Sequence, residues 1–286
     1  MMMPIAFPLL LLQVPLQTQV SGIADRSRGP TGVYAEVLET HTTVALNADE
    51  RFPMQSVYKL PICMAVLDLV DRHAMTLDTP VQVHASDLAP PGIHSPLRDE
   101  NPKGGSFTVA ELIHSAIADS DGTASDVLLG LAGGPETATA YLRGLGLTDI
   151  NIAATEAAMS RDPMIQYTNF ATPRAAVALL AVLQAGPKIA PRSRAILLNE
   201  MTNSTPGAKR LKGLLPAGTR VAHKTGTDGT VNGMTRATND IGIITLPGGR
   251  HLAIAVFIKD STADEATREA TIANIAKTVF DAWRRK

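Results

Sequence analysis

The sequence contains a single cysteine, Cys63, so it forms no intramolecular disulfide and does not fit a cysteine-based metal site. We expect Cys63 to be a small, buried apolar side chain. No pair of His, Asp or Glu residues has the spacing of metal ligands, so we expect neither a metal nor another cofactor. Only 4% of residues are aromatic and the net charge is −1 with no basic stripe, which argues against nucleic acid binding.

Long hydrophobic runs are also few. Residues 1–15 are apolar, but no Lys or Arg precedes the apolar core and no small-x-small cleavage site follows it. The segment is too short to span a bilayer, and its three prolines disfavour a continuous helix. We interpret it as an atypical secretion signal, which implies a periplasmic or secreted protein. The alternative is a disordered apolar tail that results from the choice of start codon. No other stretch has transmembrane length, so we expect no stable membrane insertion.

The apolar content, 45% of 286 residues, is sufficient for a large core. Strand-forming stretches occur near both ends of the chain, at 31–38, 42–46, 219–224, 234–246 and 251–259. Helical patterns occur at 17–28, 56–72, 109–119, 123–131, 135–145, 173–184, 191–203 and 264–283. Residues 76–107, rich in Pro, Asp and Gly, are predicted to be a loop, and residues 151–172 show no clear periodicity.

This order of elements predicts an α+β fold. Both groups of strands would join in one antiparallel sheet, flanked by the terminal helices, with the helical region as an insertion. The sheet domain would comprise residues 16–50 and 206–286, and residues 51–205 would form an all-α domain. We expect an active site at the interface of the two domains, in a monomeric protein.

Ser56 and Lys59 stand three residues apart at the predicted start of a helix, so their side chains share one face. A serine hydroxyl beside an amine that accepts a proton is an activated nucleophile. The pair alone is a weak signal, because Ser and Lys recur at this spacing by chance in a chain of this length.

Three further stretches strengthen the signal of this pair. Ser120-Asp121-Gly122 lies where one helix ends and the next begins, although Ser120 alone would be an ordinary helix N-cap. Glu156 places a carboxylate in the irregular region, where a solvated Glu is the default interpretation. Lys224-Thr225-Gly226-Thr227 lies on a predicted strand, which by itself would be a surface strand with one Lys.

In this order the four elements resemble the motif set of class A serine β-lactamases, which penicillin-binding proteins share in part. The runs 52–59, 210–218 and 222–227 carry the similarity, which extends over nearly the whole chain and is strongest to an extended-spectrum branch with an altered loop around the catalytic Glu. The resemblance implies a β-lactamase/transpeptidase-like fold. It also implies that the partner is a small β-lactam, whose ring is hydrolysed in penicillins and cephalosporins.

The resemblance assigns a role to each motif residue. Ser56 would attack the lactam carbonyl and form an acyl-enzyme, Lys59 would hold and deprotonate Ser56, and Glu156 would activate the water that deacylates. Ser120 would pass a proton to the leaving nitrogen. The backbone N–H groups of Ser56 and Thr227 would form the oxyanion hole. Whether Lys59 or Glu156 is the base for acylation stays open at this point.

The remaining roles concern substrate binding. Lys224, Thr225 and Thr227 would bind the substrate carboxylate, on a strand whose Gly226 also belongs to the site. Arg210 would support this pocket; the alternative is a surface Arg at a helix end. His94 would lie at the mouth of the cleft; the alternative is an exposed, inert histidine.

Several positions depart from the pattern of the family. Gly122 replaces an Asn, which should widen the cleft and weaken substrate anchoring. Ser160 replaces an Asn of the Glu loop and has a shorter reach toward the hydrolytic water. Ala154 replaces a common Arg and so removes a salt bridge from that loop. Asp126 replaces an Asn, with Asn169 as a candidate partner across the loop.

Two other activities remain as alternatives. A D-Ala-D-Ala carboxypeptidase or penicillin-binding protein shares the Ser, Lys and Lys-Thr-Gly elements but lacks the Glu loop. A non-hydrolytic β-lactam sensor would be acylated and would then signal, which requires membrane spans that the sequence does not show beyond its N-terminus.

Overall fold

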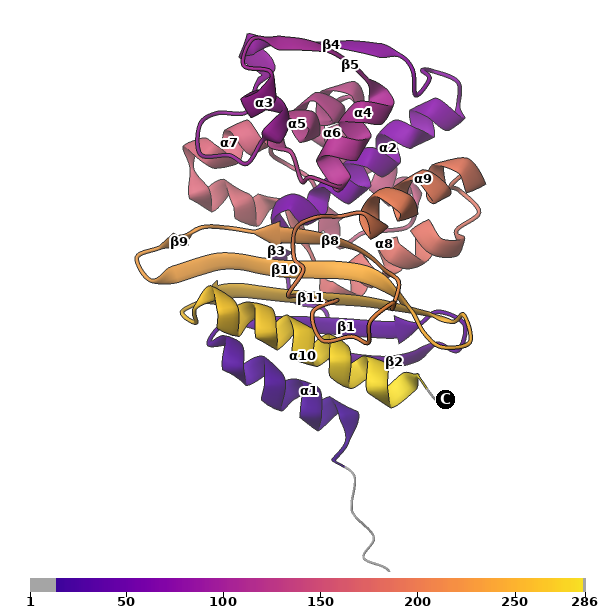
Figure 1. The fold of residues 1–286 in the computed structure, drawn as a ribbon, viewed down its shortest axis with the longest axis vertical. Helices are drawn as coiled ribbons and strands as arrows, with labels where there is room; N and C mark the ends of the chain where they lie inside the picture. The colour runs from indigo at the N-terminus through magenta and orange to yellow at the C-terminus, as the bar shows by residue number, and fades with distance from the viewer. Residues whose placement is uncertain (1–13, 285–286) are drawn as a thin grey trace, which may run out of the picture.

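The computed structural model describes residues 14–284, so the proposed secretion signal lies outside the described residues except for its last two positions. A twisted antiparallel sheet lies across the lower half of the molecule in Figure 1, with the first and the last helix beneath it and the other helices above. Its strands run in the order β2-β1-β11-β10-β8, and β9 pairs with β10. The bounds are β1 Thr31–Val37, β2 Thr42–Leu46, β8 Val221–Thr227, β9 Thr230–Val231, β10 Met234–Thr245 and β11 His251–Ser261. The expected α+β class is confirmed.

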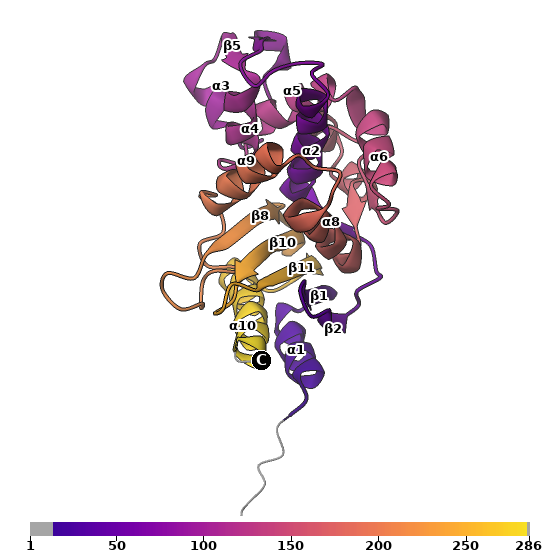
Figure 2. The ribbon, with the colours of Figure 1, turned by 90° about the vertical axis from the view of Figure 1, so that its right-hand side faces the viewer.

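The expected helices are present, most of them within a few residues of the expected bounds. They are α1 Leu16–Ala24, α2 Lys59–Asp71, α4 Val109–Ile117, α5 Gly122–Leu131, α6 Gly134–Gly144, α8 Pro173–Ala185, α9 Pro191–Thr202 and α10 Glu265–Trp283. In the side view of Figure 2, α1 and α10 cover one face of the sheet and α8 and α9 lie on the other. Strand β11 shows why both faces of the sheet are covered. Its side chains from Leu252 to Ile258 are apolar and alternate between the two faces. Ile254 and Val256 belong to the core between the sheet and helices α1 and α10, whereas Ala255 and Phe257 belong to the core on the other face of the sheet.

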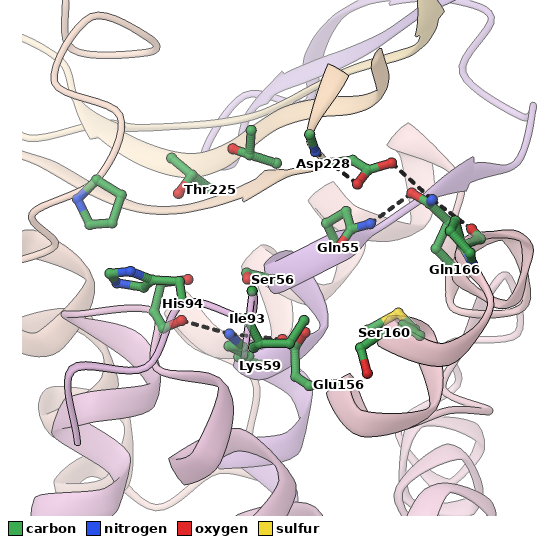
Figure 3. A pocket seen from close by; sticks show the side chains of 17 residues that line it. Gln55, Ser56, Lys59, Ile93, His94, Glu156, Ser160, Gln166, Thr225 and Asp228 are labelled. Carbon is green, nitrogen blue, oxygen red and sulfur yellow. Dashed lines mark hydrogen bonds and ion pairs between the residues drawn. The ribbon is translucent and has the colours of Figure 1, made fainter. Parts of the chain in front are cut away.

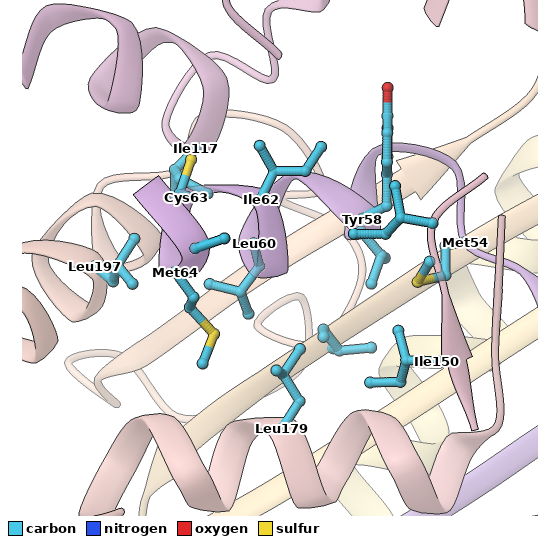
Figure 4. Close-up of a cluster of buried hydrophobic side chains, with 14 of the residues drawn as sticks. Met54, Tyr58, Leu60, Ile62, Cys63, Met64, Ile117, Ile150, Leu179 and Leu197 are labelled. Atoms are coloured by element: carbon cyan, nitrogen blue, oxygen red, sulfur yellow. The ribbon is translucent and has the colours of Figure 1, made fainter. Parts of the chain in front are cut away.

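Helix α2 lies at the centre of the helical part of the molecule. Its first nine residues, Lys59 to Leu67, are all buried, as expected for a helix that is surrounded by core. Leu179 of α8 and Leu197 of α9 are among the side chains packed in this cluster (Figure 4). Cys63 is fully buried, as expected, and burial raises the pKa of its thiol to about 12.

The prediction of a loop over residues 76–107 was wrong. This segment forms strands β4 Pro80–His84 and β5 Gly104–Thr108, which pair antiparallel, and helix α3 Pro96–Glu100. Gly104 has a φ of +78°, and a Cβ there would lie 2.1 Å from the Val83 carbonyl oxygen. The glycine that suggested a loop is therefore what lets the two strands approach.

The irregular region after residue 150 also contains short elements. Strands β6 Ile150–Asn151, β7 Phe170–Ala171 and β3 Phe52–Pro53 form a small sheet in the order β3-β7-β6. Between β6 and β7 lie helix α7 Glu156–Arg161 and the 3₁₀ helix η4 Pro163–Thr168. We keep the proposal of a sheet domain (16–50 and 206–286) and an all-α domain (51–205), and note that residues of both share one hydrophobic core.

Asn239 connects the sheet to the segment that precedes Ser56. Its side chain is fully buried in β10, and its Nδ2 donates to the carbonyls of Pro53 at 2.8 Å and Met54 at 3.1 Å. Its Oδ1 accepts from the backbone N–H of Ile258 at 3.3 Å. Gly226 pairs with Asn239 across the sheet, and a Cβ on Gly226 would lie 2.2 Å from the Met54 oxygen. This asparagine and this glycine therefore hold the segment against β8, a relation for which the sequence contains no signal.

We expect Asn239→Ala to lower the free energy of unfolding by about 2–4 kcal/mol, because it leaves buried backbone groups without partners. Urea denaturation followed by circular dichroism measures this loss. Asn199→Ala is a suitable control, since Asn199 is exposed on α9, and should change the value by less than about 0.5 kcal/mol. An equal effect of the two substitutions would contradict the role given to Asn239.

Candidate active site

A cavity of about 410 Å³ lies between β8, the start of α2, the α7–η4 segment and the loop before α3 (Figure 3). Eight of the residues singled out in the sequence line it: Ser56, Lys59, His94, Ser120, Glu156, Ser160, Thr225 and Thr227. Lys224 adjoins the cavity through its contact with Ser120. The structure thus brings together residues that are up to 171 positions apart in the chain, from Ser56 to Thr227.

The side chain of Lys59 connects three parts of the site. Ser56 lies in the 3₁₀ helix η2 Gln55–Tyr58, and Lys59 begins α2 directly after it. The Lys59 Nζ lies 2.9 Å from Glu156 Oε1 and donates to the Ser120 carbonyl at 2.7 Å. Only 2% of the Lys59 side chain and 7% of the Glu156 side chain are exposed. The pair therefore interacts with little screening by solvent.

Ser120 lies at the corner between α4 and α5 with a φ of +62°, a strained value for a residue other than glycine. Asp121 fixes this corner, because its buried carboxylate accepts from the N–H groups of Ala124 and Leu97, each at 2.8 Å. The Lys224 Nζ donates to Ser120 Oγ at 2.8 Å. Burial, followed by the nearby charge of Lys59, holds the pKa of Lys224 well below its usual value. The serine hydroxyl is therefore next to an amine that exchanges a proton more readily than an exposed lysine does.

Glu156 is held at the first position of α7 by contacts on both sides. The carboxylate of Asp126 accepts from the N–H groups of Glu156 at 2.8 Å and Ala157 at 3.0 Å. Asn169 does not serve as the partner of Asp126 that we expected. Its side chain instead binds the backbone of the segment before Glu156, at Ala153 and Ala154. The two residues thus fix neighbouring stretches of the same loop.

Comparisons with known proteins agree with this geometry. Residues 15–283 match the family model described as the β-lactamase enzyme family. The chain is 37% identical to the extended-spectrum β-lactamase PER-1 of Pseudomonas aeruginosa, over 93% of this chain and 86% of the relative. It is also 37% identical to the β-lactamase VEB-1 of the same organism, over 85% and 82% of the two chains. The chain belongs to the class A β-lactamase family.

Solved structures of this family have the same fold. A β-lactamase from Chitinophaga pinensis superposes with a TM-score of 0.91 at 40% identity, covering 93% of this chain and 98% of the other. The TLA-3 extended-spectrum β-lactamase also reaches 0.91, at 39% identity, with coverage of 94% and 98%. A class A β-lactamase from Bacteroides cellulosilyticus reaches 0.88 at 31% identity, covering 96% and 100%. The resemblance inferred from the motifs is confirmed.

The structure does not have the open space that we expected beside Gly122 in the cleft of this β-lactamase. Gly122 is buried beneath the loop before α3, and its N–H donates to the His94 carbonyl at 2.9 Å. A Cβ on Gly122 would lie 2.5 Å from Ile93 Cγ2, so the Ile93 side chain takes the space that a larger residue would need. Ile93 and His94 line the cavity there in place of residue 122.

Arg210 and Gly226 do not themselves line the described cavity, and the expected role of Arg210 in supporting the carboxylate pocket stays a prediction. Arg210 is 4% exposed and forms an ion pair with Glu269 at 3.2 Å. Its Nη1 donates to the carbonyls of Asn239 at 3.0 Å and Gly226 at 3.4 Å. Arg210 therefore supports the backbone of β8 from behind, and Gly226 lets that strand approach Met54.

The remaining residues from the sequence fall into two places. His94 is exposed at the mouth of the cavity, with its Nε2 2.9 Å from the Asp119 carbonyl oxygen. The Ser160 hydroxyl lines the cavity and donates to the Ala157 carbonyl at 2.9 Å. His223, which precedes the Lys-Thr-Gly element, is fully buried, and its Nδ1 lies 2.9 Å from Asp240 Oδ1.

The buried carboxyl group of Asp126 should make the free energy of unfolding depend on pH. Burial raises the pKa of its carboxyl to about 6, against the opposing effect of the two backbone N–H donors. Because this value lies above that of an unfolded Asp, the folded protein binds the proton more tightly. The resulting stabilisation is present at low pH and is lost as the pH rises through about 6.

We therefore expect the parent protein to lose about 1–3 kcal/mol of unfolding free energy relative to Asp126→Asn between about pH 4 and pH 7. Urea denaturation of both proteins at the two pH values measures this difference, and the Asn variant cancels the contribution of all other titrating groups. A difference between the two proteins that stays constant with pH would contradict the assignment.

Proposed function

We propose that this protein hydrolyses the β-lactam ring of penicillins and cephalosporins through an acyl-enzyme on Ser56. The observation that supports this most strongly is the cluster of Lys59, Ser120, Glu156 and Lys224 around one cavity that Ser56 lines. It provides a nucleophile, groups that exchange protons on both sides of it, and a carboxylate for the hydrolytic step.

In the acylation step, the Ser56 Oγ attacks the lactam carbonyl carbon while its proton moves to Lys59, or through a water to Glu156. The backbone N–H groups of Ser56 and Thr227 stabilise the oxyanion, a contribution of about 3–4 kcal/mol in comparable sites. The C–N bond of the ring then breaks, and Ser120 gives its proton to the lactam nitrogen. Lys224 replaces that proton, which its lowered pKa favours.

In the deacylation step, Glu156 takes a proton from a water molecule, whose oxygen attacks the ester carbonyl. The ester C–O bond breaks, and the proton that Glu156 took from the water passes to the Ser56 Oγ, which restores the Glu156 carboxylate. The product then leaves with a new carboxylate. The rigid attachment of Glu156 through Asp126 and Asn169 supports this role, because a general base must hold its position relative to the ester.

The substrate carboxylate would bind at Lys224, Thr225 and Thr227, where β8 borders the cavity. PER-1 and TLA-3 are described as extended-spectrum enzymes. We extend this to the present chain as a proposal: penicillins and early cephalosporins are substrates, and oxyimino-cephalosporins are accepted as well. His94 and Ser160 would contact the substrate from the opposite side of the cavity. The Gly122 argument does not support this spectrum, because Ile93 fills the space beside it.

Location and assembly follow from the proposed activity. We propose a periplasmic or secreted protein, because β-lactam targets lie outside the cytoplasm, and we keep the expectation of a monomer from the sequence as a proposal. Among residues 14–284, no helix has the length and apolarity needed to cross a membrane. A β-lactam sensor that relays its signal through the membrane gains no support from this part of the chain.

Glu156→Gln should trap an acyl-enzyme that the parent protein releases quickly, because the amide cannot accept the proton of the water. We expect deacylation of benzylpenicillin to slow by about 10²–10⁴-fold. Intact-protein mass spectrometry should then show a penicilloyl adduct, and peptide mapping should place it on Ser56. Glu136→Gln is the matched control, since Glu136 is exposed on α6 and should leave turnover unchanged.

The alternatives give different outcomes in the same experiment. A parent protein that itself keeps the adduct for hours would indicate a penicillin-binding protein or carboxypeptidase. A parent protein that neither turns over benzylpenicillin nor forms an adduct would overturn the proposed function.

A further inference from the structure

His223 and Asp240 form a buried pair of titratable side chains that the proposed mechanism does not use. His223 lies on β8 and Asp240 on β10, and both side chains are fully buried. The His223 Nδ1 lies 2.9 Å from Asp240 Oδ1 and 3.0 Å from Oδ2. The backbone N–H of Leu211 donates to the same carboxylate at 3.1 Å. We call His223 and Asp240 the buried dyad.

The second ring nitrogen of His223 indicates where the proton of the dyad lies. This Nε2 is buried and has no hydrogen-bond partner in the described part of the chain. A proton on Nε2, in a neutral ring or in an imidazolium, would be a buried donor without an acceptor. A proton on Nδ1 instead points at the carboxylate. The arrangement with the fewest unpaired donors is therefore a neutral His223 that donates from Nδ1 to an ionised Asp240.

Two arginines lie on the same face of the sheet as the dyad, and each has a partner of its own. Arg210 forms an ion pair with Glu269 of α10 at 3.2 Å. Arg268 of α10 donates from Nε to Thr238 Oγ1 at 2.8 Å. The dyad therefore brings a negative charge to the back of β8 that is hydrogen-bonded to a neutral ring and one backbone N–H.

Lys224 lies on the other face of the same strand, where it adjoins the cavity. Its Nζ donates to Ser120 Oγ at 2.8 Å and to the Thr225 carbonyl at 3.2 Å, and neither partner is charged. In the pairing of β8 with β10, Lys224 stands opposite Ile241, the residue next to Asp240. The Asp240 carboxylate therefore lies behind the part of the strand that carries Lys224.

The charge state of Lys224 depends on groups from several elements. Burial and then the positive charge of Lys59 lower the pKa of Lys224. The carboxylates of Asp240 and Glu156 act in the opposite direction, Asp240 more strongly, and Cys63 contributes least. Glu156 is paired with Lys59 at 2.9 Å, so much of its charge is balanced there. Asp240 is therefore the carboxylate whose loss should most weaken the binding of the proton by Lys224.

We propose that the buried dyad is a positioning element of the carboxylate pocket, in which the charge of Asp240 keeps Lys224 protonated. This inference rests on the proposed β-lactamase activity. A neutral Lys224 would neither attract the substrate carboxylate nor return a proton to Ser120. His223 supplies the donor that lets the buried Asp240 stay ionised. Both members of the dyad act through Lys224 and touch no substrate, so they are positioning residues and not catalytic ones.

The test is the alkaline limb of the pH profile of kcat/KM, which reports the ionisation of the free enzyme. Asp240→Asn keeps the shape of the side chain and removes its charge. We expect the limb for benzylpenicillin to move by about one pH unit toward lower pH, the size expected for two buried charges on opposite faces of one sheet. His223→Leu should move the limb in the same direction, because a buried carboxylate with fewer donors takes up a proton more readily.

Three controls separate this effect from general loosening of the fold. In His223→Asn the amide nitrogen replaces Nδ1 as the donor, so the limb should stay near that of the parent. Asp71→Asn is the matched control, because Asp71 accepts from Ser193 Oγ at 2.6 Å and from the Ala190 N–H at 3.3 Å at the end of α2. It should leave the limb unchanged. The double variant His223→Leu/Asp240→Asn should match Asp240→Asn, since both substitutions remove one charge.

The outcomes are distinct. If the parent protein does not turn over benzylpenicillin, the proposed function fails and the role of the dyad fails with it. If the parent is active but Asp240→Asn lowers kcat/KM by the same factor at every pH, or leaves the limb in place, only the role of the dyad is overturned. If Asp240→Asn does not fold, as judged by its thermal transition, the comparison of His223→Leu with His223→Asn decides.

Discussion

The structure depends on the close contact between strand β8 and the segment that precedes Ser56. At Gly226 the two backbones approach so closely that a single added carbon would lie 2.2 Å from the Met54 oxygen. Asn239 binds the same segment through two carbonyls, and Arg210 binds the carbonyls of Gly226 and Asn239 from behind. This contact brings Ser56 beside Thr227. The proposed oxyanion hole, which needs N–H groups from both residues, exists only because of it.

The second constraint is the burial of charge around the nucleophile. Lys59, Glu156 and Lys224 are nearly inaccessible to solvent, which costs free energy unless each group has partners. The Lys59–Glu156 pair at 2.9 Å and the carbonyl of Ser120 provide partners for the first two, and Ser120 and Thr225 provide them for Lys224. Burial also keeps the pKa of Lys224 low. The burial of these three charged side chains thus lowers the stability of the fold. The same burial supplies the site with groups that exchange protons.

The sequence predicted those parts of the site that depend on the spacing and order of residues along the chain. Ser56 and Lys59 share a helix face by spacing alone, and the sequential order of the other motifs was sufficient to recognise the family. It did not predict what depends on contacts between distant side chains. The cover of Ile93 over Gly122 is one such contact. The strands near residues 80 and 105 were missed for a related reason, because Pro and Gly mark loops and the ends of short hairpins equally well.

The central claim is that Ser56 is the nucleophile and that its own N–H and that of Thr227 bind the oxyanion. The most direct measurement is a crystal structure of the parent protein with a phenylboronic acid, whose tetrahedral adduct mimics the transition state. We predict a bond between boron and Ser56 Oγ, with one boronate oxygen within about 3 Å of the N–H groups of Ser56 and Thr227. A boron atom bonded to Ser120 or Thr225, or an oxygen directed away from Thr227, would contradict the account.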